Sequence, residues 1–384
     1  MDERKFINEI LSWPESDEPR LIYADWLEER DDPRGEFIRV QCALSQDRLD
    51  STERQRLKRR ERELLRAHNK TWLSERPSNT RDPKFVRGFI GHIAMNVKTF
   101  ISQGFQICAQ VPLESIELTG GGDQMKDLIK CKWLRQIKAI NFKRNRFPAH
   151  SIASFAACVY LENLQSLEIS ATRCDLNDLR ALCNPFSMRE LRCLSLDYTN
   201  INDRGMCMVA DAECFRNLES LRLEKSDVSG DFIQGALFNE SLRKLEISDA
   251  RYNPRGNAII HNLIRADSPV FPNLEALILN GMFVSNHSFV ELVNSHRFPN
   301  LHTLGLNHCD IDDDGAFVLA GSQLLGQLTD LRMSYNNLDL DGIMALARSP
   351  QRRKGARFYL PQESLAKREV AAFRSEFGNF GELA

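Results

Sequence analysis

Polar and charged side chains recur at a fixed place in the middle of this chain, between leucines that repeat with a constant spacing. Carboxylates and guanidinium groups in such positions can bind a charged partner. Tyrosines beside them are suited to anchor a partner. The candidate partner-binding residues are Glu168, Asp197, Tyr198, Arg222, Glu224, Glu246, Asn280, Asn307, Arg332 and Tyr335.

The mixture of charges in this group favours a protein partner. Its middle is mildly acidic and suits a basic or polar protein patch better than a phosphate backbone. There, Arg222 and Lys225 lie between four acidic residues, Glu168, Asp197, Glu224 and Glu246. For any one of these residues, a solvated strand position is the simpler interpretation. For the surface as a whole, we expect it to bind a protein or peptide.

The residues that could serve catalysis or hold a metal do not form a known site. The sequence has no phosphate loop, no G-x-S-x-G, no H-E-x-x-H and no set of kinase motifs. His302 and His308 fall at opposite ends of one strand segment, too far apart to share a zinc ion. Acidic residues between Asp25 and Glu36 have no histidine among them and are expected to pair with Arg34 or Arg39 around a turn. We therefore expect no enzymatic activity, no metal and no cofactor.

One charged segment is a candidate for nucleic-acid or acidic-partner binding. It contains Arg54, Arg56, Lys58, Arg59, Arg60, Arg62 and Arg66. Glu53, Glu61 and Glu63 interleave with these bases, and no aromatic residue is available within the segment for stacking on bases. A solvated helix is the favoured interpretation, and nucleic acid is disfavoured as a partner.

Composition indicates a cytoplasmic globular protein. The chain has 384 residues, 42% apolar and 27% charged, with a formal net charge of -2. The charged N-terminus does not resemble a signal peptide, and no run approaches the ~20 apolar residues that span a membrane. The ten cysteines include no C-x-x-C pair, and we expect them to be small core residues in a reducing compartment. We expect a monomer.

A repeated phrase must position the candidate residues. Its clearest copies are Leu164–Thr172, Leu191–Thr199 and Leu218–Ser226, and their starts are 27 residues apart. From Leu113 onward there are nine firm copies, preceded by a degenerate one near Ile90 and followed by a final strand that caps the array, residues 357–360. Alternating side chains indicate a strand in each phrase, and the rest of each unit has helical spacing.

Such units can bury their leucines only by stacking. Because helices are wider than the ~4.8 Å strand spacing, the stack must curve with parallel strands on the concave face and helices on the convex face. The predicted fold class is therefore an α/β solenoid, a horseshoe, with a small all-α domain at its N-terminus. The 27-residue step resembles the ribonuclease-inhibitor class of leucine-rich repeats, while steps of 24 and 32 residues depart from it. The longer step predicts a surface loop around residues 267–269.

The first part of the chain reads as helices over residues 2–12 and 20–30 and from Glu36 onward. The run Tyr23-Ala24-Asp25-Trp26-Leu27-Glu28, followed by Arg34-Gly35-Glu36, resembles the signature of the bacterial repeat-companion domain. This resemblance covers roughly residues 1–46. It implies no activity, but it implies that repeats follow, as they do.

The predicted organisation has four parts: a helical module at 1–73, a connection at 74–88, the repeat array at 89–360 and a C-terminal capping helix at 361–384. The first functional hypothesis is a non-catalytic scaffold that binds a protein or peptide on the concave face. The alternative is an adaptor or regulatory subunit of an enzyme complex, in which the helical module recruits machinery and the repeats select the target.

Overall fold

The computed structural model describes residues 3–46, 49–142, 145, 147–148, 150–170, 174–249, 253–265, 270–361 and 368. It divides into two compact units. The first comprises Met1–Asn145 with Val159–Leu164, and the second comprises Arg146–Cys158 with Gln165–Ala384. Twelve strands follow one another in sequence order among the described residues, β1–β4 in the first unit and β5–β12 in the second.

The first unit opens with four helices: α1 Glu3–Ser12, α2 Glu18–Glu28, α3 Pro33–Leu44 and α4 Ser51–Trp72. Asp32 and Asp50 begin α3 and α4 by accepting hydrogen bonds from backbone N–H groups of the first turn. Gly35 allows α2 and α3 to approach closely, because a Cβ there would lie 2.6 Å from the carbonyl oxygen of Ala24.

Two apolar clusters hold these helices together. One is formed by Phe6, Ile10, Tyr23, Ala24, Leu27, Ile38, Cys42 and Phe89. The other is formed by Phe37, Val40, Leu64 and Trp72, in which the Phe37 and Trp72 rings stack with centroids 4.6 Å apart. On the surface, Arg39 forms ion pairs with Asp25 and Glu28, whereas Glu36 pairs with Arg60 of α4.

The strands of the first unit begin with an antiparallel pair, β1 Arg81–Val86 and β2 Phe89–Asn96. β3 Ser115–Thr119 and β4 Ala139–Phe142 then continue in parallel, with helices α5 Val97–Cys108 and α6 Met125–Leu128 between strands. The residues expected to connect the module to the array, 74–88, thus include a strand of their own. The division of the chain into parts at 1–73, 74–88, 89–360 and 361–384 stays a prediction.

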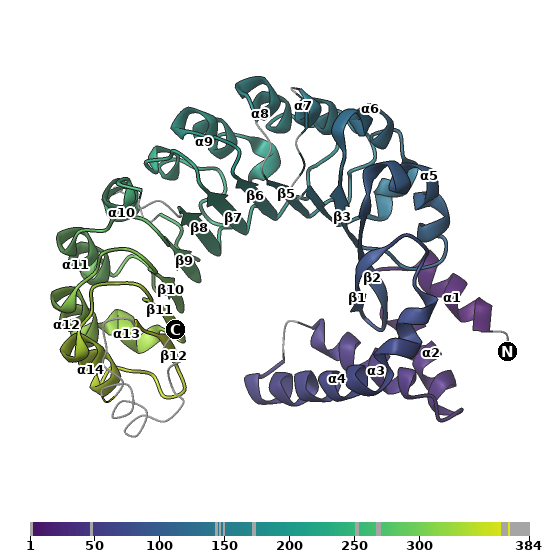
Figure 1. Cartoon of the computed structure of the whole chain (residues 1–384), viewed down its shortest axis with the longest axis horizontal. Coiled ribbons are helices and arrows are strands. Elements are labelled where there is room, and N and C mark those ends of the chain that lie inside the picture. The colour runs from purple at the N-terminus through teal and green to yellow at the C-terminus, as the bar shows by residue number, and fades with distance from the viewer. Residues whose placement is uncertain are drawn as a thin grey trace. The chain divides into compact units, whose positions relative to one another are not determined.

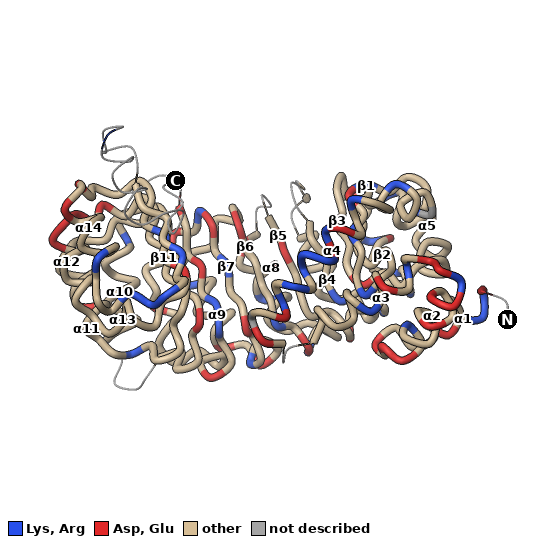
Figure 2. The backbone as a smooth tube through the Cα atoms, turned by 90° about the horizontal axis from the view of Figure 1, so that it is seen from below, with Lys and Arg blue, Asp and Glu red and all other residues tan. Residues whose placement is uncertain are grey.

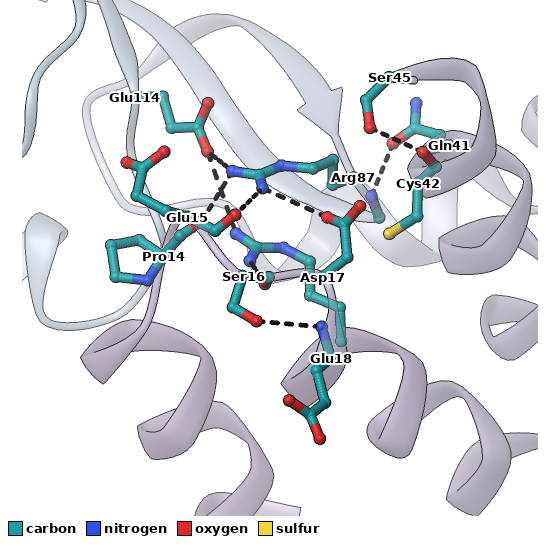
Figure 3. A network of polar contacts seen from close by, with 12 residues as sticks. Pro14, Glu15, Ser16, Asp17, Glu18, Gln41, Cys42, Ser45, Arg87 and Glu114 are labelled. Carbon is teal, nitrogen blue, oxygen red and sulfur yellow. Dashed lines mark hydrogen bonds and ion pairs between the residues drawn. The ribbon is translucent and has the colours of Figure 1, made fainter. Parts of the chain in front are cut away.

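A polar network joins the loop between α1 and α2 to β2 and β3 within the first unit (Figure 3). Arg87, in the turn between β1 and β2, donates hydrogen bonds to the carbonyl oxygens of Pro14 (2.7 Å) and Glu15 (3.0 Å). It also forms ion pairs with Asp17 (3.3 Å) and with Glu114. Burial lowers the pKa of Arg87, but the two carboxylates outweigh it and the net shift is upward.

Arg20 of α2 lies beneath this network and has no exposed surface. Its Nη1 donates to the carbonyl oxygen of Ser16 (2.7 Å), and its Nη2 lies 4.0 Å from the Glu114 carboxylate. Burial, and then the charge of Arg87, lower the pKa of Arg20. The Glu114 carboxylate therefore faces two guanidinium groups, that of buried Arg20 and that of partly buried Arg87, and lies 3.5 Å from the Lys138 ammonium.

The second unit is a regular parallel array. Its strands are β5 Ser166–Ser170, β6 Cys193–Asp197, β7 Ser220–Glu224, β8 Lys244–Ser248, β9 Ala276–Ile278, β10 Thr303–Gly305, β11 Asp330–Arg332 and β12 Arg357–Tyr359. The leucines of successive phrases pair in register, from Leu194 and Leu221 through Leu304 and Leu331. All of them are buried. The predicted cap strand is β12. The loop around 267–269 lies outside the described residues, and so does the predicted capping helix apart from residues 361 and 368.

The segments before β5 and between the strands hold the helices of the unit: α7 Ser151–Ala156, α8 Leu176–Leu182, α9 Asp203–Ala210, α10 Gly256–Ile264, α11 Asn286–Asn294, α12 Asp313–Gly321, α13 Gln323–Gln327 and α14 Leu340–Arg348. Within this unit the strands line the inner side of a curve and the helices its outer side (Figure 1). The 24-residue step between β7 and β8 is short because a 3-10 turn, η5 Asp231–Ile233, replaces the helix. The predicted fold class is confirmed.

The small or polar position at the end of each phrase closes the backbone behind the strand. Asn336 shows how this works, because its buried amide donates to the carbonyl oxygens of Leu306 (2.6 Å) and Met333 (2.8 Å). Its carbonyl accepts from the N–H groups of Cys309 (3.0 Å) and Ile311 (3.1 Å). One side chain thus pairs four backbone groups that would otherwise be buried without a partner. No helix within the described ranges combines the length and the apolarity needed to cross a bilayer.

Replacing Arg87 by methionine tests the polar network. The Arg87→Met variant removes the guanidinium from Asp17 and leaves Glu114 with Lys138 and the more distant Arg20. We expect the free energy of unfolding to fall by about 2–3 kcal/mol, the order of charge-assisted hydrogen bonds lost at partly buried groups. Urea unfolding monitored by circular dichroism measures it. Arg76→Met, at an exposed position, is the control and should change the free energy by less than about 0.5 kcal/mol. Equal losses in the two variants would show that the network does not stabilise the unit.

Candidate functional site

The candidate residues lie on or directly after the strands of the second unit, with the side chains of the strand positions between the buried leucines facing the inner side of the curve. We call this surface, formed by the outward positions of β5–β12 and the residues just after them, the concave face. Six of the ten candidates are strand residues, from Glu168 on β5 to Arg332 on β11, and the other four follow β6, β9, β10 and β11. Figure 2 marks the charged residues along these strands.

Arg222 is the centre of a charged cluster on the concave face. Its Nε lies 3.3 Å from a carboxylate oxygen of Asp197 and 3.5 Å from one of Glu246, in ion-pair rather than hydrogen-bond geometry. Its Nη2 donates to Glu224 (3.0 Å), and Lys244 pairs with Glu246 (2.9 Å). Five side chains from three adjacent strands are thereby brought together.

The electrostatics of this cluster follow from its partial burial. Burial lowers the pKa of Arg222, but the carboxylates of Asp197, Glu246 and Glu224 raise it more. Asp197 behaves in the opposite way, because burial raises the pKa of its carboxyl and Arg222 offsets this only in part. The guanidinium charge is therefore compensated inside the protein, and the partly exposed carboxylates of Glu224 and Glu246 are the groups that remain accessible to a partner.

Three of the candidates have a structural role that the sequence did not reveal. The side-chain oxygens of Asp197, Asn280 and Asn307 accept hydrogen bonds from the backbone N–H groups of Glu224 (3.0 Å), Asn307 (2.9 Å) and Ser334 (2.9 Å). Each bond joins one repeat to the next at the same place in the phrase, one residue after the third leucine. That common position was a signal available in the sequence. Whether these three residues also bind a partner stays a prediction.

A row of residues with left-handed backbone borders the concave face. It comprises Tyr198 (φ 57°), Lys225 (φ 53°), Gly281 (φ 72°), His308 (φ 56°) and Tyr335 (φ 59°), and we call it the rim. At Gly281 the backbone excludes a side chain, since a Cβ would lie 1.4 Å from the carbonyl oxygen of Asp249. The rim therefore has side chains in two groups, one on either side of Gly281.

Aromatic side chains dominate both groups of the rim. Tyr198 is 40% exposed, and the Lys225 ammonium lies 4.5 Å from its ring centroid. The Tyr198 hydroxyl donates to Glu224, which raises the pKa of the phenol. Tyr335 is 52% exposed, and the ring of His308 stacks on it at 4.3 Å and 7°. The role of the two tyrosines as anchors stays a prediction, and the contacts of Lys225 and His308 with their rings were not predicted from the sequence.

The C-terminal end of the concave face has more positive than negative groups, in contrast to the cluster around Arg222. Asp330 is buried, and its carboxylate lies 2.7 Å from Arg332 and 3.2 Å from Arg357. The hydrogen bond from Arg332 to Asp330 raises the pKa of that guanidinium. Two arginines share one carboxylate here, whereas carboxylates outnumber cations around Arg222. The concave face is therefore acidic over β5–β8 and basic over β11 and β12.

One group among the described residues has the ligand types and spacing of a metal site. The ligand atoms of His150, Asp175 and Asp178 lie within 4.8 Å of one another. However, both carboxylates already cap α8, where Asp175 accepts from the N–H groups of Asn177 and Asp178. Asp178 also accepts from the N–H of Ala153. The arrangement is explained by helix capping, and nothing in its geometry requires an ion.

Six of the ten cysteines have the environment of core residues, and the other four are partly buried. The six buried ones are Cys42, Cys108, Cys131, Cys158, Cys174 and Cys309. Burial raises the pKa of Cys309 to about 12, which disfavours the reactive thiolate.

Comparison with known proteins supports the repeat assignment. A family model described as leucine-rich repeat matches residues 299–320 and 328–347, which include β10, β11 and most of α12 and α14. A search of curated proteins gives no match. Among solved structures, the chain is similar to a crystal structure of a Bacteroides fragilis protein, with 15% identity and a TM-score of 0.34. This match covers 70% of the chain and 64% of that protein. The chain contains leucine-rich repeats, a class that is generally protein-binding and usually non-catalytic.

Replacing Asp197 by asparagine tests the electrostatics of the cluster. Because the folded protein raises the pKa of this carboxyl above its ordinary value of 3.8, its contribution to stability is present at low pH and is lost as pH rises through the folded pKa. Asparagine keeps the oxygen that accepts from Glu224 but does not titrate. We therefore expect the unfolding free energy of Asp197→Asn, relative to the wild type, to increase from about pH 3 to about pH 7.

Urea unfolding at a series of pH values measures this difference. Asp341→Asn, at an exposed position on α14, is the matched control. A difference for Asp197→Asn that stays constant or decreases with pH would contradict the upward shift.

Proposed function

We propose that the protein is a non-catalytic scaffold whose concave face binds a protein or peptide. The observation that carries this proposal is the rim, where Tyr198 and Tyr335 expose large rings on left-handed backbone. Exposed tyrosines with fixed rings lose little conformational freedom when a partner covers them, which makes them effective anchors. Leucine-rich repeats generally act as protein-binding scaffolds, and this supports the same conclusion.

The charge distribution of the concave face defines the partner further. The carboxylates of Glu168, Glu224 and Glu246 favour basic residues opposite β5–β8, and Arg332 and Arg357 favour acidic residues opposite β11 and β12. A peptide that runs across the strands, with its basic part opposite β5–β8 and its acidic part opposite β11 and β12, is complementary to both ends of the concave face. A uniformly charged polyanion is complementary only to the end at β11 and β12.

Several further features belong to the same proposal. Residues 1–73 form a repeat-companion module, the array extends over 89–360, and the protein is a cytoplasmic monomer. The contacts of α1–α4 support the first point, since the helices share two apolar clusters. In the alternative function, an adaptor of an enzyme complex, this module would recruit machinery while the concave face selects the target.

Peptides selected from a random phage-displayed library against the full-length chain test the scaffold. We expect the selected peptides to lose affinity by about tenfold or more in a Tyr198→Ser, Tyr335→Ser variant, since buried aromatic anchors contribute about 2 kcal/mol or more at interfaces. Fluorescence anisotropy with labelled peptides measures the loss.

The control for this variant removes two other exposed aromatic rings, Phe186→Ser and Phe317→Ser, which lie among the helices and their loops. It should bind the selected peptides as the wild type does. Failure to select any peptide, or an equal loss of affinity in both variants, would contradict the proposed role of the concave face.

A further inference from the structure

Helix α4 places its charged residues on different sides, although they are mixed in the sequence. In the sequence, three acids are interspersed among the bases between Glu53 and Arg66. At about 100° per residue, however, the buried and partly buried side chains Leu57, Leu64 and Trp72 fall within one arc of the helix. The remaining two arcs, both facing solvent, carry very different sets of charges.

The first solvent-facing arc contains charges that neutralise one another. Arg56 forms a bidentate pair with Glu53 (2.8 and 2.9 Å). Arg60 bonds to Glu63 (3.1 Å) and, with two hydrogen bonds of 2.6 and 2.7 Å, to Glu36 of α3. The third acid of the helix, Glu61, accepts a hydrogen bond from Gln41 (2.8 Å). All three glutamates of α4 therefore already have partners within the module.

The second solvent-facing arc, about 120° wide at 100° per residue, contains only cations and uncharged residues. Its cations are Lys58, Arg59, Arg62, Arg66 and Lys70, all exposed, and we call this arc the basic stripe. In the part of the chain that the structure describes, none of the five has a carboxylate partner; Arg62 donates only to the carbonyl oxygen of Lys58 (3.1 Å). The bands of Lys and Arg on α4 are visible in Figure 2.

The basic stripe carries a cost that a merely solvated helix would avoid. Lys58 and Arg62, Arg62 and Arg66, and Arg66 and Lys70 are like-charge pairs four residues apart. Each such pair destabilises a helix, whereas a glutamate at one of these positions would form a stabilising ion pair with its neighbour. Over the ~18 Å between Lys58 and Lys70, the helix thus holds an uncompensated row of charges at a rise of 1.5 Å per residue.

We propose that the basic stripe of α4 binds an acidic segment of a partner protein. Carboxylates spaced along such a segment offer bidentate acceptors to the three arginines, and this complementarity would remove the like-charge repulsion. The proposal does not rest on the proposed function, because the stripe belongs to the first unit and shares no residue with the concave face. It supplies the kind of recruiting surface that the adaptor alternative requires.

Two observations favour a protein segment over nucleic acid. Nucleic-acid-binding domains are basic overall, but residues 1–73 contain seventeen acidic and fifteen basic residues. A double helix wider than the basic stripe would therefore also meet repulsive surface, whereas a single extended acidic chain can follow the stripe. The basic stripe has no aromatic residue on which a base could stack, since Trp72 is buried against Phe37.

Binding of fluorescent poly-L-glutamate to the full-length chain at low ionic strength tests the proposal. We expect wild-type protein to bind it with an affinity that falls as salt is added. A variant with Lys58→Gln, Arg62→Gln and Arg66→Gln should bind about tenfold more weakly, the order expected when three exposed ion pairs are lost. All three positions are solvent-exposed, and circular dichroism checks that α4 remains folded.

The matched control removes the same number of lysines and arginines elsewhere, with Lys98→Gln, Arg204→Gln and Arg353→Gln, all exposed. It should bind poly-L-glutamate within about twofold of the wild type. Equal weakening in both triple variants would overturn the proposal, because the attraction would then be diffuse. A DNA duplex of equal charge is tested in the same way. If it binds the wild type more tightly than poly-L-glutamate does, and the α4 variant loses this binding, the partner of the basic stripe is nucleic acid and the proposal is overturned.

Discussion

No strand of the repeat array can satisfy its own backbone or bury its own leucines, and the rest of the second unit depends on this constraint. Each phrase places its leucines in register with those of the next, and side-chain oxygens such as those of Asp197 and Asn307 tie adjacent repeats together. Asn336 pairs four further backbone groups. Because every repeat needs its neighbour, the positions between the leucines are held on a rigid surface whose side chains can vary without loss of the fold.

The same ladder explains how the rim is maintained. Left-handed backbone at a residue with a side chain is unfavourable by about 1–2 kcal/mol, yet Tyr198, Lys225, His308 and Tyr335 all adopt it. The backbone N–H groups of Tyr198, Lys225 and His308 donate to carbonyl oxygens of the following repeat, as when Tyr198 donates to Glu224. The array therefore fixes the backbone at these three positions, and Tyr198 and His308 expose aromatic rings there.

The sequence predicted what depends on periodicity and missed what depends on distant partners. The spacing of residues such as Leu194 and Leu221 was enough to predict the strands, their order and the side that faces the curve. β1 was missed because its residues have no alternating pattern and pair only with β2. The network of Arg87 joins residues 27 to 73 positions apart, so nothing local marks it. For Asp197, the sequence predicted an exposed binding residue, but its carboxylate is buried between repeats.

The two proposed binding surfaces share one property, although different elements build them. In most of the chain, local preferences agree with the fold: aspartates cap helices, leucines pair in register and acids neutralise nearby arginines. The rim departs from these preferences because its non-glycine residues adopt left-handed backbone. The basic stripe departs from them because like charges lie next to one another on the helix. Natural proteins depart from local consistency mainly where function requires it. A stripe that merely kept α4 soluble would need only mixed charges, as the arc with Arg56 and Arg60 demonstrates. The excess of one sign therefore points to a partner that supplies the other.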